Sequence, residues 1–276
     1  MLSKLRVDPG DAARLDARDP GDRLGIGGKA AAAVVLDGHL ARLRVLQTRL
    51  FAEGARAALL VLQGVDASGK DGTIRRVFSG INPQGCRVAS FKAPSTLESA
   101  HDYLWRIHAA LPRRGEIGIF NRSHYEDLVT ASLHGTIATA QRRRRIRHVR
   151  DFERMLVDEG TVVVKVWLHV SKHEQRARLQ ARLDDPEKRW KFDPDDLATR
   201  RRWDEVMALY DEVVAATSTR WAPWYVVPAD HRWVRDVAVA ALLVRALERL
   251  DPRFPEPDPR LDGVVVEERL ADPEEP

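Results

Sequence analysis

The sequence has very little cysteine, few aromatic residues and no long apolar run. Cys86 is the 1 cysteine among 276 residues, so no disulfide bond can form within one chain. No stretch approaches the roughly 18 apolar residues of a membrane-spanning helix, and Met1 to Asp8 carry no apolar signal region. We therefore expect a cytoplasmic protein with no membrane partner, in which Cys86 is a packed side chain.

Positive charge is in slight excess, and arginine supplies most of it. The formal net charge is +4, and the 45 basic residues comprise 37 Arg and 8 Lys. Such an excess suits a polyanionic ligand. Nucleic acid is the obvious polyanion, but the chain has no helix-turn-helix, zinc-finger or RNP-type signature, and aromatic residues make up only 7%. We expect no nucleic-acid partner.

A glycine-rich segment follows the first strongly apolar run of the chain. Residues 64–72 read Gly-Val-Asp-Ala-Ser-Gly-Lys-Asp-Gly, directly after the apolar residues 58–63. This pattern predicts a phosphate loop, because its backbone N–H groups and the positive end of the next helix bind phosphate oxygens, and the lysine adds a mobile charge. The alternative is a glycine-rich turn that binds nothing. The phosphate-binding residues that we predict here are Gly64, Ala67, Ser68, Gly69, Lys70, Asp71 and Gly72.

Two acidic residues set this loop apart from that of common P-loop enzymes. Asp71 stands where a Ser or Thr usually holds magnesium, although an acid also suits the first turn of a helix. Asp66 lies inside the loop, where a carboxylate repels phosphate unless a divalent cation lies between them. We therefore predict that Asp66 is a metal ligand. The alternative is a turn-forming Asp that bonds to nearby backbone.

Apolar strands alternate with helices along most of the chain. We predict strands at 58–63, 87–92, 116–120, 161–169 and 224–228, and helices at 30–53, 72–80, 97–110, 139–159, 172–216 and 231–250. This alternation predicts an α/β fold, a three-layer α/β/α sandwich around a parallel sheet of about five strands. In such sheets ligands bind beyond the carboxyl ends of the strands.

The composition divides the chain into three parts. Residues 1–29 are polar, and we expect an arm that lies over the surface or over a neighbouring subunit. Residues 30–255 form the P-loop domain. Residues 256–276 are rich in Pro, Asp and Glu and are expected to be a loosely held tail.

A second motif follows the predicted strand 116–120. Residues 121–127 read Asn-Arg-Ser-His-Tyr-Glu-Asp. Arg122, at the carboxyl end of this strand, is predicted to face the phosphate loop and to offset the charge of the transferred phosphate; the alternative is a structural pairing with Asp127. His124 is expected to be a scaffold residue. The catalytic residues that we predict are Asp66, Lys70 and Arg122, the nucleotide-binding residues are Asn82, Lys92, Arg122, Glu126 and Asp127, and the metal ligands are Asp66 and Asp127.

Residues 176–203 are predicted to form a lid. Two helical stretches are separated by the helix break Asp184-Asp185-Pro186 and a basic, aromatic turn, and the second helix begins at Asp193-Pro194. Such a hairpin can close on phosphates and exclude water; the alternative is a solvated charged hairpin. The lid cations that we assign to a phosphate polymer are Arg178, Arg182, Lys188 and Arg189. The competing run Arg142 to Arg145 points around a helix and is expected to be solvated or in an interface.

At these three motifs the sequence resembles the polyphosphate kinase 2 family, and its class III branch in particular. The resemblance covers about residues 30–255, and it extends to Leu-Asp-Asp-Pro-Glu-Lys-Arg-Trp-Lys-Phe at 183–192, Asn-Pro-Gln-Gly at 82–85, Phe-Lys-Ala-Pro at 91–94 and Trp-Ala-Pro-Trp-Tyr at 221–225. It implies a P-loop kinase-like fold, and magnesium or manganese as the cofactor. Other branches often carry Asp at the position of Asn121, so metal ligation is not transferred to Asn121.

The resemblance implies reversible transfer of the terminal phosphate of inorganic polyphosphate to AMP and ADP. The expected partners are polyphosphate and AMP, ADP and ATP, with guanine nucleotides as a further option, and we expect a homo-oligomer, either a dimer or a tetramer. Two other functions stay open at this point. An ATP-dependent nucleoside monophosphate kinase would share the fold, although it would usually carry Ser or Thr in place of Asp71. A non-catalytic polyphosphate- or nucleotide-binding regulator should have lost one of the charged elements, yet all are present.

Overall fold

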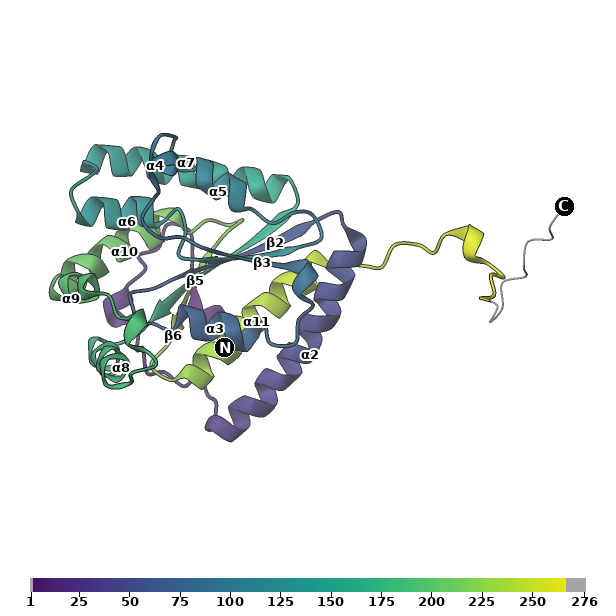
Figure 1. The fold of residues 1–276 in the computed structure, drawn as a ribbon, viewed down its shortest axis with the longest axis horizontal. Helices are drawn as coiled ribbons and strands as arrows, with labels where there is room; N and C mark the ends of the chain where they lie inside the picture. The colour runs from purple at the N-terminus through teal and green to yellow at the C-terminus, as the bar shows by residue number, and fades with distance from the viewer. Residues whose placement is uncertain (1, 267–276) are drawn as a thin grey trace.

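The computed structural model describes residues 2–266, which form a six-stranded sheet between two layers of helices (Figure 1). The strand order is β1-β6-β5-β2-β4-β3. The strands are β1 (Arg6–Val7), β2 (Ala57–Gln63), β3 (Cys86–Ser90), β4 (Ile117–Asn121), β5 (Thr161–His169) and β6 (Trp224–Pro228). Five strands run parallel, as predicted, while β1 pairs antiparallel with β6 at the edge. The prediction missed β1 because two residues carry no periodic signal.

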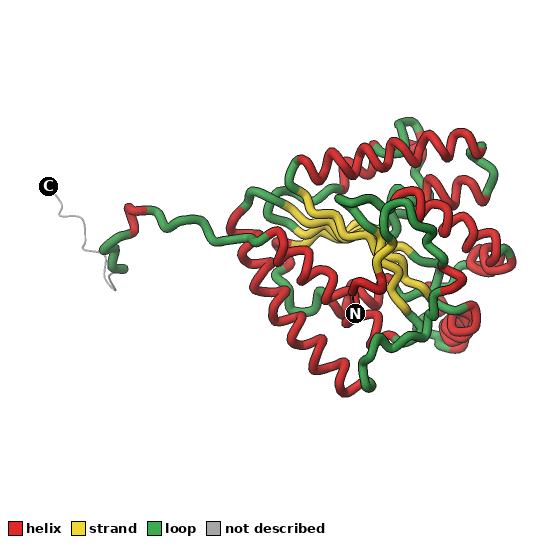
Figure 2. The backbone as a smooth tube through the Cα atoms, turned by 180° about the vertical axis from the view of Figure 1, so that it is seen from behind, coloured by secondary structure: helices red, strands yellow, loops and turns green. Residues whose placement is uncertain are grey.

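The central strand β2 is apolar on both faces as far as Leu62. All seven residues of β2 are buried, and β2 lies between β4 and β5, with Leu60 opposite Ile119 and Val164. A strand with helices on both faces exposes no side to water, so its residues are apolar without alternation. Figure 2 shows the helices above and below this sheet. The predicted three-layer α/β/α arrangement is therefore confirmed.

The helices fall on two faces. On one face α2 packs against α11, which also contacts α3; on the other α6, α7 and α10 contact one another. The larger helices are α2 (Lys29–Glu53), α3 (Lys70–Val77), α6 (Glu126–Leu133), α7 (Thr139–Asp158), α8 (Lys172–Asp184), α9 (Pro194–Arg201), α10 (Trp203–Thr217) and α11 (Arg232–Leu250), and the short ones are α1 (Leu2–Leu5), α4 (Thr96–Ser99) and α5 (Trp105–Ala110). Helix α6 was not predicted, and the predicted helix 97–110 is interrupted between α4 and α5.

The helix break predicted in the lid is present. Helix α8 ends at Asp184, and α9 begins at Pro194 after Asp193, whose side chain accepts a hydrogen bond from the backbone N–H of Asp195. Proline at the first helical position and an aspartate cap before it are the usual chemistry of a helix start. The residues that we call the lid, after their predicted role, comprise the second half of α8, a connecting segment with a 3-10 turn at Arg189–Lys191, and α9.

The N-terminal segment packs on its own chain. Leu5, Val7 and Leu15 are each no more than 3% exposed, and β1 extends the sheet beside β6. The chain after α11 extends away from the body (Figure 1). Of the predicted tail, residues 267–276 lie outside the described residues. No helix among residues 2–266 is long and apolar enough to cross a membrane.

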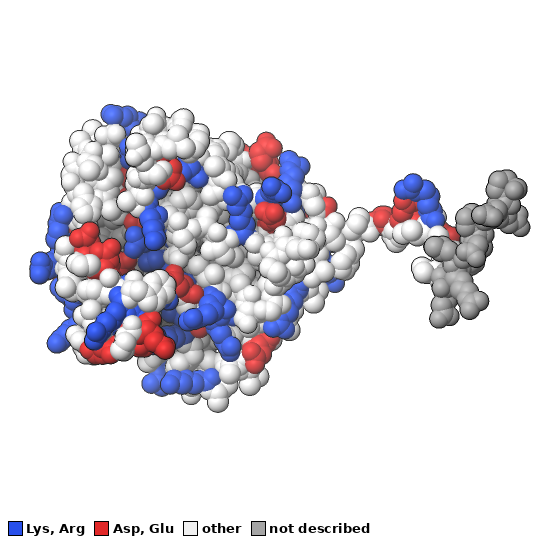
Figure 3. All heavy atoms as spheres, viewed as in Figure 1, with Lys and Arg blue, Asp and Glu red and all other residues white. Residues whose placement is uncertain are grey.

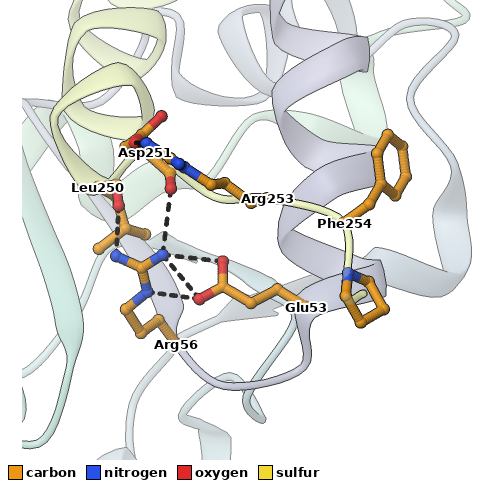
Figure 4. Close-up of a pocket in the computed structure, with 7 residues that line it drawn as sticks. Glu53, Arg56, Leu250, Asp251, Arg253 and Phe254 are labelled. Atoms are coloured by element: carbon orange, nitrogen blue, oxygen red, sulfur yellow. Dashed lines mark hydrogen bonds and ion pairs between the residues drawn. The ribbon is translucent and has the colours of Figure 1, made fainter. Parts of the chain in front are cut away.

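A hollow lies at the amino-end edge of the sheet, away from the phosphate loop. It measures about 590 Å³ and is lined by residues just before β2 and after α11. Figure 4 shows Arg56 between Glu53, which accepts at 2.7 Å, and the carbonyls of Leu250 and Asp251. Arg56 thus caps the carbonyl end of α11. The charged and carbonyl groups that line the hollow pair with one another, and Arg253 pairs with Asp251. We therefore assign this hollow a structural role.

Candidate functional site

The segment 64–72 forms a tight loop between β2 and the first turn of α3. The backbone N–H of Ser68 bonds to the carbonyl of Val65 at 3.1 Å, and that of Thr73 to the carbonyl of Gly69 at 2.9 Å. Gly69 has φ +107°, and a Cβ there would lie 1.9 Å from a guanidinium nitrogen of Arg235 in α11. Only glycine fits both conditions. The guanidinium of Arg235, which is 3% exposed, therefore packs directly against the loop backbone at Gly69. The amphipathic pattern of α11 did not reveal this role.

Lys70 lies beneath this loop. Its side chain is buried, and Nζ donates to the carbonyls of Gly64 at 2.7 Å and Val65 at 3.3 Å. Burial lowers the pKa of the Lys70 ammonium, and the nearby Arg122 lowers it further, while Asp66 opposes both. The ammonium group thus lies at the loop's own carbonyls, within the predicted phosphate cradle.

Asp66 is paired with Arg122 across the site. Nη2 of Arg122 donates to Oδ1 of Asp66, and the two side chains are 37% and 22% exposed. Burial acts to raise the pKa of Asp66, but Lys70 and Arg122 together hold it below its ordinary value. The carboxylate is therefore ionised at neutral pH. The alternative pairing of Arg122 with Asp127, considered from the sequence, is not the one formed.

Arg122 also has an unusual backbone. Its φ is +62°, a conformation that a residue with a side chain seldom adopts, and its N–H donates to the carbonyl of Leu62 in β2 at 3.0 Å. Strain of this kind persists only where the surroundings hold the backbone. This turn at the end of β4 aims the guanidinium at the loop.

Asn121, the residue before Arg122, contacts Asp71, the second acid of the loop. Nδ2 of Asn121 donates to Oδ1 of Asp71 at 2.7 Å. Asn121 and Arg122, which are consecutive at the end of β4, therefore contact both acids of the loop. An amide at position 121 can donate to a carboxylate, whereas an aspartate there would face Asp71 with like charge.

The remaining members of the second motif are held by protein groups. Glu126 accepts from Oγ1 of Thr130 at 2.7 Å. With the nitrogen of its amide oriented toward Glu126, Gln63 donates to that carboxylate at 3.0 Å, and its oxygen accepts from Ser123. Asp127 accepts from Arg106 at 3.2 Å. Burial raises the pKa of Asp127, although Arg106 opposes that rise.

Arg106 also links Asp127 to Lys92. Its Nη1 donates to the carbonyl of Lys92 at 2.8 Å, at the carboxyl end of β3. The structure thus brings Lys92 and Asp127 to one place, as predicted. Beside them a hollow of about 400 Å³ is lined by Lys92, Arg106 and the half-exposed ring of Trp105.

Asn82 does not lie where the sequence prediction put it. It precedes β3, at the amino-end edge of the sheet, and its side chain caps the 3-10 turn Pro83–Gly85 by accepting from the N–H of Gln84 at 3.1 Å. The neighbouring Gly85 lies against Gln47 of α2. A nucleotide contact by Asn82 is therefore corrected to a capping role, because the phosphate loop opens at the opposite edge.

Arg178 is also corrected. All five of its N–H groups are bound to protein acceptors: Glu174 at 2.8 Å, Ala67 at 3.1 Å, Ser68 at 3.0 Å, Ala229 at 2.6 Å and Asp230 at 2.9 Å. The guanidinium has no donor left for a phosphate polymer. Arg178 fixes the loop carbonyls from behind, and helical spacing alone could not distinguish this face from a substrate-facing one.

The other lid cations differ from Arg178. Lys188 pairs with Asp185 and keeps 60% of its side chain exposed, and Arg189 donates from Nε to the carbonyl of Leu183 at 2.6 Å. Figure 3 shows basic and acidic side chains gathered at the end of the molecule that carries α8 and α9. In the competing run, Arg142 pairs with Glu212 and Arg145 donates to the carbonyl of Asp127, while Arg143 and Arg144 are exposed.

Asp196 in α9 is a site residue that sequence reasoning missed. It is 8% exposed, its carboxyl group lies against that of Asp66, and Arg182 approaches it at 3.7 Å. Burial raises the pKa of Asp196 to about 7, and the adjacent Asp66 carboxylate adds to the rise. In the sequence Asp196 is one of three acids around Pro194, a pattern that ordinary helix capping explains. The lid thus contacts the phosphate loop through a pair of carboxyl groups.

The donor set at Asp66 fits a hard divalent cation. Two carboxyl groups in contact offer oxygen ligands, and Mg²⁺ is usually bound by one or two carboxylates together with water and substrate phosphates. Among residues 2–266 no group of three or more His, Cys, Asp or Glu could hold a metal ion by itself. Asp127, predicted as the second ligand, is paired with Arg106, and no described ion pair or hydrogen bond joins it to Asp66.

Comparison with known proteins agrees with this architecture. Residues 30–255 match the family model described as polyphosphate kinase 2. The AMP/ADP-polyphosphate phosphotransferase of Meiothermus ruber is 49% identical over 267 residues, covering 96% of this chain and 100% of that protein. The ADP-polyphosphate phosphotransferase of Rhodopseudomonas palustris is 44% identical over 230 residues, which cover 79% and 80%.

Solved structures give the same result. The crystal structure of polyphosphate kinase 2 from Arthrobacter aurescens superposes with a TM-score of 0.88 at 43% identity, covering 92% of this chain and 91% of that one. The family model spans most of the chain, and the relatives align along most of their length. The structural similarity leads to the same family. The chain belongs to the polyphosphate kinase 2 family.

Proposed function

We propose that this enzyme transfers the terminal phosphate of inorganic polyphosphate to AMP and ADP, reversibly. The family membership makes it a transferase, and the relative from Meiothermus ruber, named for AMP and ADP, is 49% identical over almost the whole chain. That match is the observation that carries the proposal. Other relatives are named for GDP, so we propose guanine nucleotides as a secondary substrate class.

Charge neutralisation at the loop explains how the chain would perform this reaction. Phosphoryl transfer needs positioning and electrostatic stabilisation more than acid–base chemistry. Lys70, beneath the loop, is proposed to exchange its bonds to the carbonyls of Gly64 and Val65 for donor and acceptor phosphate oxygens. Arg122 is proposed to bind the phosphate in transfer through its planar fork.

A divalent cation, Mg²⁺ or Mn²⁺, is proposed to be held at Asp66. When bound, it would supply positive charge to the phosphate oxygens. Asp66 would have to release Arg122, with which it pairs, and Arg122 would then be free for phosphate. We withdraw Asp127 as a metal ligand in favour of its pairing with Arg106.

The acceptor nucleotide is proposed to lie between the end of β4 and the end of β3. Arg122, Glu126 and Asp127 border this region on one side, and Lys92 with the ring of Trp105 on the other. For polyphosphate we propose Arg182, Lys188 and Arg189 of the lid, because a polymer with one charge per unit is recognised by a run of cations. A cytoplasmic location and a homo-oligomer stay predictions.

Donor choice separates this proposal from its rivals. The initial rate of ADP formation from AMP should be high with long-chain polyphosphate as donor and at least tenfold lower with ATP at equal phosphate concentration. An ATP-dependent monophosphate kinase would give the reverse order. A non-catalytic binding protein would retain polyphosphate affinity and give no product with either donor.

A further inference from the structure

A fully buried polar cluster lies in the protein behind the second motif. Lys165 of β5, Glu153 of α7 and Tyr125, which directly precedes α6, are each 0% exposed. Nζ of Lys165 donates to Glu153 at 2.6 Å, to the carbonyl of Thr217 at 2.7 Å and to the hydroxyl of Tyr125 at 3.1 Å. The Tyr125 hydroxyl donates in turn to the other oxygen of Glu153, at 2.6 Å. Every donor of the ammonium group is therefore used.

Stability alone does not explain such a cluster. Removing two charges from water is costly, and replacing a buried ion pair by apolar residues of similar volume is often neutral or stabilising. What the cluster adds is a fixed position for the Tyr125 hydroxyl, which donates one hydrogen bond to Glu153 and accepts one from Lys165. The ring of Tyr125 also packs edge-on against Trp224, with centroids 4.8 Å apart.

The cluster lies directly behind the turn that carries Arg122. Lys165 is level with Val61 in β2, which is level with Phe120 in β4, two residues before Arg122. Ser123, His124 and Tyr125 are all 0% exposed, so Arg122 projects from a segment that is otherwise buried. Its strained φ of +62° needs support on the protein side.

The same cluster reaches the far end of the helix that follows the lid. Thr217, whose carbonyl accepts from Lys165, is the last residue of α10, the helix that follows the lid helix α9 directly. Its hydroxyl accepts from the indole N–H of Trp224 at 2.8 Å. One ammonium group thus connects the end of α10, the centre of the sheet and the residue before α6.

We propose that Lys165, Glu153 and Tyr125 are positioning residues that hold the Arg122 turn in its catalytic geometry. They touch no substrate, and they act through the backbone of residues 122–125. The proposal rests on the proposed function for its kinetic readout, but not for its structural one.

Tyr125→Phe tests the proposal with the smallest change. Because small displacements of a positioned group cost much of its effect, we expect turnover to fall by roughly tenfold or more, with both Michaelis constants within about twofold of wild type. Hydrogen exchange of the amides of residues 122–126 should become at least about tenfold faster. Tyr225→Phe, at the next residue of β6 after Trp224 and on the opposite face of the sheet, is the matched control and should change neither quantity.

A double variant separates positioning from stability. Lys165→Met alone leaves the Glu153 carboxylate unpaired and should lower the melting temperature, whereas Glu153→Leu with Lys165→Met should recover most of it. In the double variant we expect turnover to stay about tenfold or more below that of wild type. Apolar side chains restore packing, but they leave the Tyr125 hydroxyl without the two hydrogen bonds that fix its position. Leu247→Ala in α11, on the opposite face, supplies a destabilised control with normal turnover per folded molecule.

Two results would overturn the proposal: wild-type turnover and exchange in Tyr125→Phe, or full recovery of turnover together with stability in the double variant. If wild-type enzyme transferred no phosphate from polyphosphate, the proposed function would fail instead. The exchange measurement would then still decide whether the cluster braces residues 122–126.

Discussion

Arg122 pairs with Asp66 across the phosphate site, so the two residues proposed to bind phosphate and metal are bonded to each other. The pair keeps a carboxylate ionised beside a buried lysine and keeps a strained arginine aimed at the loop. Both partners have to exchange this bond for substrate contacts before transfer. The predictions below follow from that exchange and from the residues that hold it in place.

Asp66→Asn should remove metal binding and leave the fold intact. Loss of a charge matched to the transition state costs about 3 kcal/mol or more, on the order of a hundredfold in rate. The measurement is turnover together with Mn²⁺ affinity by calorimetry. Asp195→Asn, an exposed change one residue before Asp196, is the control. Near-normal turnover and Mn²⁺ affinity in Asp66→Asn would reduce that carboxylate to turn chemistry.

Arg122→Lys should impair turnover although it keeps the charge. Lysine lacks the planar fork and cannot donate to two phosphate oxygens in parallel, so we expect a loss of roughly tenfold or more in turnover. The same change at the exposed Arg143 in α7 should have no effect. Equal rates for the two variants would show that the guanidinium shape is not used.

The lid arginines and lysines should divide into two classes. Arg178→Met should lower thermal stability, because it leaves the carbonyls of Ala67 and Ser68 without donors. Lys188→Ala with Arg189→Ala should instead raise the Michaelis constant for long polyphosphate, and less so at high salt, where screening already weakens the attraction. The nucleotide constant should change little. A reversed pattern, with substitutions at Arg142 and Arg145 weakening polyphosphate use, would move the polymer to another face.

Asn121→Asp should make the loop depend on cations. It would place a second carboxylate where the amide now donates to Asp71 at 2.7 Å, and like charges at that separation repel unless a cation lies between them. We expect a lower melting temperature without magnesium and a larger rise on its addition than in wild type. Asn82→Asp, at a capping position where aspartate serves equally well, is the matched control. An unchanged magnesium response in Asn121→Asp would mean that the Asp71 side chain simply turns away.

Local signals predicted most of the scaffold. The apolar run before Gly64 and the glycine pattern after it were sufficient to predict a strand, a loop and a helix there. Both signals act over a few residues, because each depends on local burial or local backbone conformation. The edge strand β1 was missed since its pairing with β6 joins Val7 to Trp224 across most of the chain. No local periodicity encodes such a partner.

The site was harder to predict where a residue's role depends on which way its side chain points in the folded protein. Arg178 and Arg182 share a helix face, yet Arg178 is committed to loop carbonyls while Arg182 lies near Asp196. Asn82 precedes rather than follows its strand, which puts it at the wrong edge of the sheet. Asp196 looked like a helix cap in the sequence, and only the fold of the lid brings it to Asp66.

The central claim is tested most directly by following ATP formation from ADP by ³¹P NMR with and without long-chain polyphosphate. ATP is expected to form only when polyphosphate and Mg²⁺ or Mn²⁺ are both present, and to stop when a chelator is added. The internal phosphate signal of the polymer should fall to match, because each transfer turns the next phosphate into the new terminus. ATP formation from ADP alone at the full rate, with AMP as the second product, would show an adenylate-kinase reaction and contradict the account.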